Sequence, residues 1–204
     1  VSLVARNRQG EGPIGDPSVA VTPVGPPILG GLTPSITEGN GAVTVTWPQP
    51  NGNGDNNLTY DVLLFQTGSE MSTTTPVGTA LSVTIPSPNA TPVRAILVVH
   101  NRYTAQRAGG VGIRSAASAI GVPFGVPRPI TSVAAAAPAA DGVVRLTFAA
   151  PPDEGRPITS YEYSVNGGGW TASPNGTSTT ITVSGLALGP SYTFRVRGVN
   201  LRGP

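Results

Sequence analysis

The sequence contains no cysteine, no lysine and only one histidine. Without cysteine the chain can form neither a disulfide framework nor a thiolate metal site. The cysteine content therefore does not indicate in which cellular compartment the protein lies. A long apolar run is missing too, so we predict no membrane span in this piece. Residues 1–6 lack the charged and apolar regions of a signal peptide, and we expect the sequence to begin inside a longer protein.

Positive charge is present but is not clustered. The 12 basic residues are all arginine, they are scattered singly, and they exceed the 10 acidic residues to give a net charge of +2. A nucleic-acid surface normally groups its basic residues and interleaves them with aromatic side chains. We therefore predict no nucleic-acid partner.

Titratable groups that could converge on a reaction are few. By strand alternation His100 is interpreted as a surface residue, and no second histidine exists to share a metal site or act beside it. Asp153 and Glu154 are adjacent acids in a loop, and Asp55 occupies the corresponding loop of an earlier repeat. Loop acids without an opposing carboxylate make a poor acid and base pair. We predict no enzyme activity, no catalytic residue, no metal site and no cofactor.

Glycine-rich and sequon-like stretches also favour structural interpretations. Gly109–Gly112 and Gly167–Gly169 precede no helix, which a phosphate-binding glycine loop requires, so we interpret them as a hairpin loop and a turn. Asn57, Asn89 and Asn175 match the glycosylation pattern, but threonine-rich turns produce such matches by chance, and we interpret the chain as bacterial.

What the sequence does contain is the chemistry of β-sheets and turns. There are 27 glycines and 22 prolines among residues dominated by valine, alanine, threonine and serine. Hydrophobic residues make up 38% of the chain, enough for small cores, and they alternate with polar residues between turn clusters. No segment keeps helical spacing for three turns. The sequence predicts an all-β chain.

An internal repeat divides the chain. Trp47 and Phe148 lie 101 positions apart in similar strands, and so do Tyr60 and Tyr161 in the strands that follow. A third element, an alternating strand that ends in asparagine, occurs at 4–7, 98–101 and 197–200. A repeat of about 100 residues predicts successive small β-sandwiches.

These residues carry a resemblance to fibronectin type III modules, namely a tryptophan on the second strand, a Tyr-x-Val third strand and an asparagine after the sixth. The segment 186–192 resembles the tyrosine corner of that family, with Tyr192 as its tyrosine. The copies depart from the pattern at Phe148, which replaces the tryptophan, and at Val93, which replaces the corner tyrosine. The resemblance implies tandem immunoglobulin-like β-sandwiches in an extended array and does not specify a function.

The resemblance also implies module boundaries. Residues 1–27 would be the last two strands of an upstream module, 28–126 a complete module, and 127–204 a module that lacks its last strand. Prolines gather at the expected joints and favour short, stiff linkers: Pro23, Pro26, Pro27, Pro123, Pro127 and Pro129.

Strand alternation predicts one apolar surface. If Tyr60 points into the core, the outward residues of the third and sixth strands of the middle copy include Leu63, Phe65, Ile96 and Val98. Contiguous apolar patches usually mark contacts, and we propose these four as a candidate binding patch. Three explanations stay open: cover by the chain itself (the loop 101–115 or the strand after Phe65), cover by a neighbouring chain, or an error in register.

Trp170 is the second candidate. It follows three glycines in an expected hairpin and could stack on a sugar ring, although a tryptophan lying along a sheet edge is the commoner arrangement.

Three functions remain at this stage. The preferred hypothesis is a non-catalytic spacer or adhesion array of an extracellular or cell-surface protein, with neighbouring modules and possibly another protein or a polysaccharide as partners. The alternatives are accessory modules of a secreted polysaccharide-degrading glycoside hydrolase, and a filament or assembly module. In the last case Ser18–Val21 of one molecule would complete the open module of the next. The simpler alternative is a fragment with frayed ends.

Overall fold

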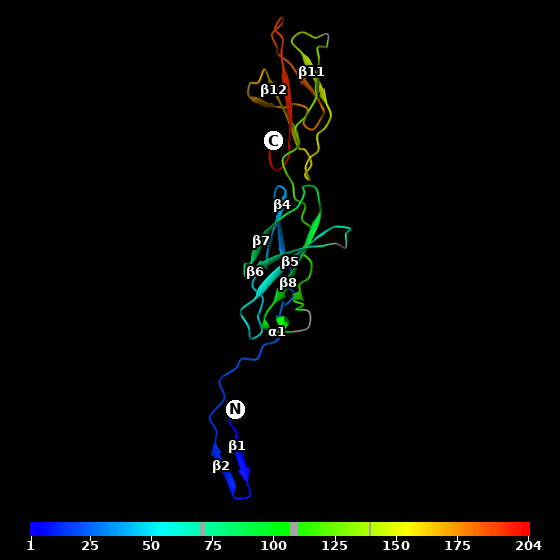
Figure 1. Ribbon diagram of the computed structural model, residues 1–204. Helices are drawn as coiled ribbons and strands as arrows, with labels where there is room; N and C mark the ends of the chain where they lie inside the picture. Colours follow the sequence, from blue (N-terminus) through cyan, green and yellow to red (C-terminus); the bar gives the residue numbers. More distant parts are fainter. Residues whose placement is uncertain (70–71, 107–109, 139) are drawn as a thin grey trace.

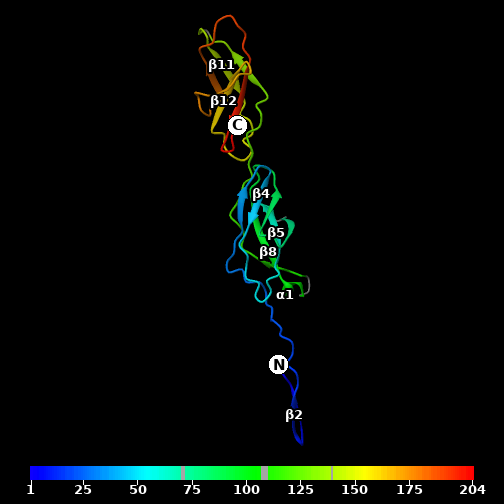
Figure 2. The ribbon, with the colours of Figure 1, turned by 90° about the vertical axis from the view of Figure 1, so that its left-hand side faces the viewer.

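The computed structural model describes residues 1–69, 72–106, 110–138 and 140–204. Figure 1 shows two β-sandwiches arranged end to end, with a two-stranded hairpin at the N-terminal end of the chain. The view turned by 90° in Figure 2 shows the same narrow, elongated arrangement. We call the two sandwiches the middle module and the C-terminal module.

The middle module consists of two antiparallel sheets. The three-stranded sheet has the order β3-β4-β7 and the four-stranded sheet the order β6-β5-β8-β9. The bounds are β3 Ser35–Glu38, β4 Ala42–Thr46, β5 Thr59–Gln66, β6 Ser72–Gly78, β7 Ser82–Pro86, β8 Val93–His100 and β9 Ile113–Arg114. A short helix, α1 (Arg102–Ala105), follows β8, in a segment for which the sequence suggested only a loop.

The C-terminal module repeats this plan with two three-stranded sheets, ordered β10-β11-β14 and β13-β12-β15. The bounds are β10 Val133–Ala136, β11 Val144–Phe148, β12 Ser160–Val165, β13 Trp170–Ala172, β14 Thr180–Val183 and β15 Phe194–Val199. The N-terminal hairpin pairs β1 (Val4–Asn7) with β2 (Gly10–Ile14). The predicted class, all-β with immunoglobulin-like sandwiches in an extended array, is confirmed.

Each sandwich has its own hydrophobic core. Alternation places the residues predicted to face inward in the middle core, where all of them are buried: Tyr60, Val62, Leu64, Ala95, Leu97 and Val99. The C-terminal core is built around Leu146, Tyr161, Ile181, Val183 and Val196. Two separate cores imply two units that could each fold alone, although the exact module boundaries stay a prediction.

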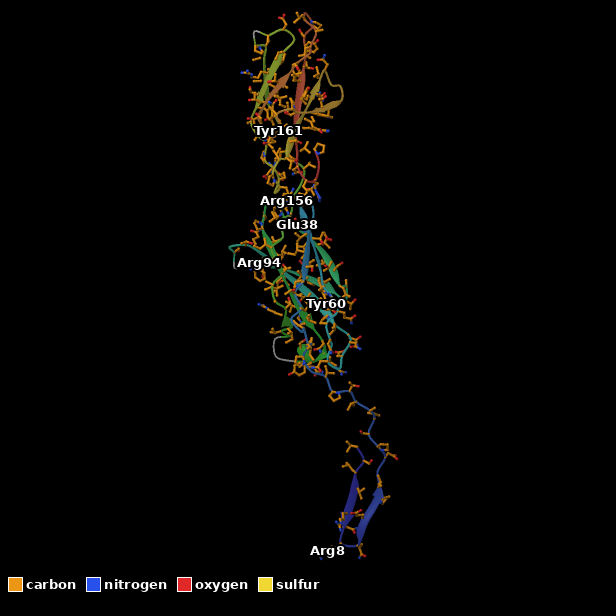
Figure 3. All side chains as sticks on the ribbon, turned by 180° about the vertical axis from the view of Figure 1, so that it is seen from behind. Arg8, Glu38, Tyr60, Arg94, Arg156 and Tyr161 are labelled. Atoms are coloured by element: carbon orange, nitrogen blue, oxygen red, sulfur yellow. The ribbon has the colours of Figure 1, made fainter. Side chains whose placement is uncertain are left out.

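The aromatic repeat seen in the sequence is a structural repeat. Trp47 meets Tyr60 edge-on at 5.5 Å between ring centroids, and Phe148 meets Tyr161 edge-on at 4.8 Å. Such pairs stabilise a core by about 0.5–1.5 kcal/mol beyond the burial of their area. Figure 3 labels Tyr60 and Tyr161, one in each sandwich.

The tyrosine corner implied by the family resemblance is also present. The Tyr192 hydroxyl donates a hydrogen bond to the Ala187 carbonyl at 3.2 Å, just before β15 begins. Val93 cannot make this bond in the middle module, and its own N–H instead donates to Gly121 O at 2.8 Å.

Candidate functional site: the junctions that hold the modules

The asparagine after β8 ties the preceding linker to the middle module. Asn101 is buried, and its Nδ2 donates hydrogen bonds to Gly25 O at 2.9 Å and Gly52 O at 3.0 Å. Its Oδ1 accepts from Thr104 N at 3.1 Å and so caps α1. One amide side chain thus satisfies backbone groups of the linker, of the loop between β4 and β5, and of the helix.

The same arrangement recurs at the C-terminal module. Asn200 is buried after β15, and its Nδ2 donates to Gly125 O at 2.8 Å and Asp153 O at 3.0 Å. Its Oδ1 accepts from Arg202 N at 2.9 Å. We call this arrangement the asparagine clamp, defined by Asn101 or Asn200 and the two carbonyls that each one binds.

A glycine in the loop next to each clamp lets the linker approach closely. Gly54 and Gly155 have φ values of +92° and +97°, and a Cβ on them would lie 2.2 Å from Pro23 O and 2.7 Å from Pro123 O, respectively. Both the positive φ and the lack of space require glycine at these positions. Neither glycine is marked by a motif in the sequence, although both lie in the corresponding loop of the repeat.

The backbone of the linker is bonded to the same loops. Gly25 N donates to Asn53 O at 2.9 Å, and Gly125 N donates to Glu154 O at 3.0 Å. Asn53 and Glu154, the acceptors, themselves have positive φ values of 50° and 55°. Clamp, backbone bond and glycine contact therefore form one repeated device at both linkers.

Side chains add contacts between the two sandwiches. Arg156 of the C-terminal module forms an ion pair with Glu38 at the end of β3, and Figure 3 shows these two side chains meeting where the sandwiches join. The second Glu38 oxygen accepts from Val122 N at 2.7 Å. Glu38 thus connects its own sheet, the linker and the next module.

Glu154 makes the second contact across the junction. Its Oε1 accepts from Arg128 Nε at 2.5 Å, and its Oε2 accepts from Asn89 Nδ2 of the middle module at 3.2 Å. The hydrogen bond from the Arg128 guanidinium, followed by that from Asn89, lowers the pKa of the Glu154 carboxyl below its ordinary value of 4.5. The charged form is the one that the junction stabilises.

An aromatic ring completes the junction. The guanidinium groups of Arg156 and Arg202 lie 4.5 Å and 5.1 Å from the centroid of the Phe124 ring. Cation–π contacts of this kind contribute about 0.5–1 kcal/mol each at exposed sites. Phe124 lies in the linker. The C-terminal module therefore contacts the linker through the side chains of Arg156 and Arg202 as well as through its clamp.

The four residues of the candidate patch lie side by side, as the register predicts. Leu63 pairs with Ile96 and Phe65 pairs with Arg94 between β5 and β8. Leu63 and Val98 are nevertheless buried, with 6% and 8% of their surface exposed, while Phe65 and Ile96 are half-buried. These four residues therefore do not form an open apolar surface.

The chain itself covers part of this face. A Cβ on Gly112, in the segment between α1 and β9, would lie 2.6 Å from Val98 Cγ1 and 2.7 Å from His100 Cε1. This contact supports cover by the chain itself, one of the three explanations left open by the sequence. A partner for the remaining exposed parts of Phe65 and Ile96 stays a prediction.

Trp170 lies on β13, the edge strand beside β12, and is 41% exposed. The Arg197 guanidinium stacks on its ring at 4.2 Å from the centroid, and the same arginine donates from Nε to Glu162 Oε2 at 2.7 Å. One cation is therefore already stacked on the indole. Binding of a sugar by Trp170 stays a prediction.

The remaining titratable candidates are paired individually. His100 Nε2 lies 3.0 Å from Asp61 Oδ2 across β5 and β8. Asp55 accepts from Arg102 N at 2.8 Å and Asn57 N at 3.1 Å, and these bonds lower the pKa of its carboxyl. Within the described ranges, no group of three or more His, Cys, Asp or Glu side chains could hold a metal ion. Nor does that part of the chain contain a helix with the length and hydrophobicity to cross a bilayer.

Comparisons with known proteins give one structural likeness. No family model and no curated protein matches the chain. Among solved structures, the chain is similar to the crystal structure of the FN1-FN3 domains of chicken CNTN1, at 15% sequence identity. The alignment covers 99% of this chain and 70% of that chain, with a TM-score of 0.40.

Proposed function

We propose that the chain is a non-catalytic spacer, a stretch of sandwich modules that holds its neighbours apart at fixed angles in an extracellular or cell-surface protein. The observation that carries this proposal is the asparagine clamp, which occurs at both linkers with the same donors and the same kinds of acceptors. A flexible tether would need neither clamp. A stiff linker needs hydrogen bonds that hold its backbone groups at each joint.

The length of the ordered junction supports the proposal. From Val122 to Gly125 the linker is bonded at successive residues: Val122 N to Glu38, Pro123 O to Ala90 N, Phe124 N to Gly39 O, and Gly125 N and O to the C-terminal module. A linker of Gly and Ser without such bonds would behave as a random coil. Here the chain passes between modules with no unbonded residue in this stretch.

The absence of cysteine makes a distance measurement straightforward, because two introduced cysteines would be the only thiols. Spin labels at Ser82→Cys in the middle module and Thr171→Cys in the C-terminal module, both exposed sites, would report the spacing across the junction. We expect a single narrow distance distribution that broadens in Asn200→Ala. A broad distribution in the unmodified junction would contradict a spacer of fixed geometry.

The alternative of accessory modules in a polysaccharide-degrading enzyme is favoured by one observation, the exposure of Trp170. It is tested by sedimenting the chain with insoluble polysaccharides and bacterial cell walls. A spacer should stay in the supernatant with or without Trp170→Ala. Retention that Trp170→Ala abolishes would favour the accessory function instead.

A further inference from the structure

A groove on the side of the middle module combines uncharged polar side chains with an apolar floor. It has a volume of about 230 Å³ and lies where the chain passes from β6 to β7, beside the loop that leads into β5. The residues that line it are Gln49, Asn56, Asn57, Leu58, Thr59, Tyr60, Thr79 and Leu81. None of these side chains is charged at neutral pH.

The polar side chains of the groove are available to a ligand. Five exposed residues supply amide or hydroxyl groups: Gln49, Asn56, Asn57, Thr59 and Thr79. Among the described residues, none of these five side chains forms a hydrogen bond with another group of the protein. Amides and hydroxyls both donate and accept, so the groove can pair with ligand hydroxyl groups in either role.

The apolar part of the groove is small and fixed. Leu58 and Tyr60, which are 3% and 2% exposed, form its floor, and Leu81, which is 39% exposed, lies at its rim. Figure 3 labels Tyr60 on the middle module. A pyranose ring carries C–H groups on its faces and hydroxyl groups around its edge. Its two kinds of surface therefore match the floor and the polar rim of the groove.

A buried donor lies next to this floor. Trp47 N donates to Leu81 O at 3.1 Å, and the Trp47 ring packs against that of Tyr60, so Trp47 contacts two residues that line the groove. Trp47 is 5% exposed, and its Nε1 has no hydrogen-bond partner within the described part of the chain. Buried donors are nearly always bonded, and an unpaired one is costly. The unpaired Nε1 points to a bound molecule beside it.

The fold itself does not require these polar groups. The repeat offset of 101 places side chains without hydrogen-bonding groups at the corresponding positions of the C-terminal module: Phe148 for Trp47, Ala150 for Gln49, Pro157 for Asn56 and Ile158 for Asn57. Both modules nevertheless form the same kind of sandwich. A purely structural role would be expected in both copies, so the polar groove is a specific feature of the middle module.

We propose that this groove binds one neutral sugar ring, with its amide and hydroxyl groups paired to the hydroxyls of the sugar. The volume of about 230 Å³ fits a single ring, since pockets for drug-sized ligands measure about 300–1,000 Å³. A phosphate or carboxylate ligand would need a cationic side chain in the lining, which is uncharged. The proposal goes beyond the spacer function and does not depend on the stiffness of the junctions.

Titration of the whole chain with soluble sugars tests the proposal. Trp170→Ala removes the other candidate sugar platform and leaves Trp47 as the only tryptophan, so its fluorescence reports on the groove. The probes are glucose, galactose, mannose and N-acetylglucosamine. We expect at least one to bind with a Kd of about 1–10 mM, as suits so small a ligand, and to shift the backbone NMR signals of residues 47–60 and 79–81. Binding by none of the four, or equal shifts around Phe148, would overturn the proposal.

Single substitutions in the groove test the assignment of its residues. Gln49→Ala and Asn57→Ala should each raise the Kd about three- to tenfold, because each removes an amide that bonds the sugar. Gln66→Ala is the matched control, since Gln66 is an exposed glutamine at the end of β5 outside the groove, and it should leave the Kd unchanged. All three residues are exposed, so each variant should keep the urea midpoint of the parent chain. A Kd unchanged in both groove variants would overturn the proposal.

The charge of the ligand provides an independent test. Because no charged side chain lines the groove, the Kd should be the same at low and high salt. Glucuronate should bind no more tightly than glucose. Tighter binding of glucuronate, or binding of the neutral sugar that weakens as salt is added, would contradict an uncharged site.

Discussion

Replacing Asn200 by alanine should loosen the junction and destabilise the C-terminal module. The side chain is 4% exposed and makes the bonds to Gly125 O, Asp153 O and Arg202 N. A hydrogen bond of this kind contributes about 0.5–1.5 kcal/mol net, and a buried carbonyl left without a partner costs about 1–3 kcal/mol. We therefore expect the free energy of unfolding of this module to fall by about 2–4 kcal/mol.

Asn200→Asp removes the hydrogen-bond donor of the side chain while nearly keeping the size of the side chain. Aspartate keeps an acceptor for Arg202 N but places a carboxylate against the carbonyl oxygens of Gly125 and Asp153. At neutral pH it should destabilise the module at least as much as alanine, because a charged acceptor facing two acceptors is unfavourable. This result would show that Asn200 acts mainly through the hydrogen bonds that its Nδ2 donates to the two carbonyls.

The chain supplies its own control. Asn7 ends the first copy of the same motif, but it is exposed, and its Oδ1 accepts a hydrogen bond from the nearby Gln9 N at 2.8 Å. Asn7→Ala should change the free energy of unfolding by less than about 0.5 kcal/mol. Urea denaturation followed by circular dichroism, with hydrogen exchange in β15 to identify the affected module, measures all three variants. If Asn200→Ala were no more destabilising than Asn7→Ala, the clamp would have no energetic basis.

Three further outcomes follow from the same contacts. Leu63→Ser should lower the free energy of unfolding of the middle module by about 2–4 kcal/mol in urea denaturation, since Leu63 is only 6% exposed; an unchanged midpoint would mean that the residue faces solvent. Gly155→Ala should broaden the distance distribution across the junction, because its Cβ would lie 2.7 Å from Pro123 O at a φ of +97°, and an unaffected distribution would refute the close contact. The lowered pKa of Glu154 means that its contribution is complete above 4.5 and is lost as the pH falls through the lower value of the folded state. The free energy of unfolding should therefore fall less steeply with decreasing pH in Glu154→Gln than in the unmodified chain. Identical pH curves would mean that the contact between Glu154 and Arg128 does not contribute to the pH dependence of stability.

Alternation and repeat spacing were sufficient to predict the two faces of the main sheets. Tyr60 and Leu97 are buried where period-two counting places them, and Phe148 takes the role of Trp47 against its tyrosine. These features depend on local geometry, since each side chain's direction follows from its place in a strand. The tyrosine corner likewise spans only the few residues between Ala187 and Tyr192.

Burial on the outer face could not be predicted in this way. Alternation correctly places Val98 outside the core, but Val98 is only 8% exposed, and Gly112, a residue that lies beyond α1, packs closely against it. A contact between a strand and a distant irregular segment leaves no periodic signal in either. Sequence patterns therefore predict the side of the sheet more reliably than they predict solvent access.

In the sequence, the junctions are marked by clustered prolines and by a recurrent asparagine, but the contacts that form them are not. Asn101 and Asn200 stood out because their strands repeat, but their partners are carbonyl groups of Gly25, Gly52, Gly125 and Asp153. Every residue has a backbone carbonyl, so no pattern of side chains indicates which carbonyls the asparagines bind. Linker, loop and asparagine come together only in the folded chain.

That dependence on backbone atoms separates two properties of the array. The linker residue that the clamp binds is glycine in both cases, whereas the residue before it differs, being Val24 at one linker and Phe124 at the other. The lateral contacts do depend on side chains: Arg156 meets Glu38, whereas its counterpart in the repeat, Asp55, is bonded to Arg102 N within its own module. The clamp is thus common to both linkers, while the side-chain contacts beside each clamp differ with the charges that stand there.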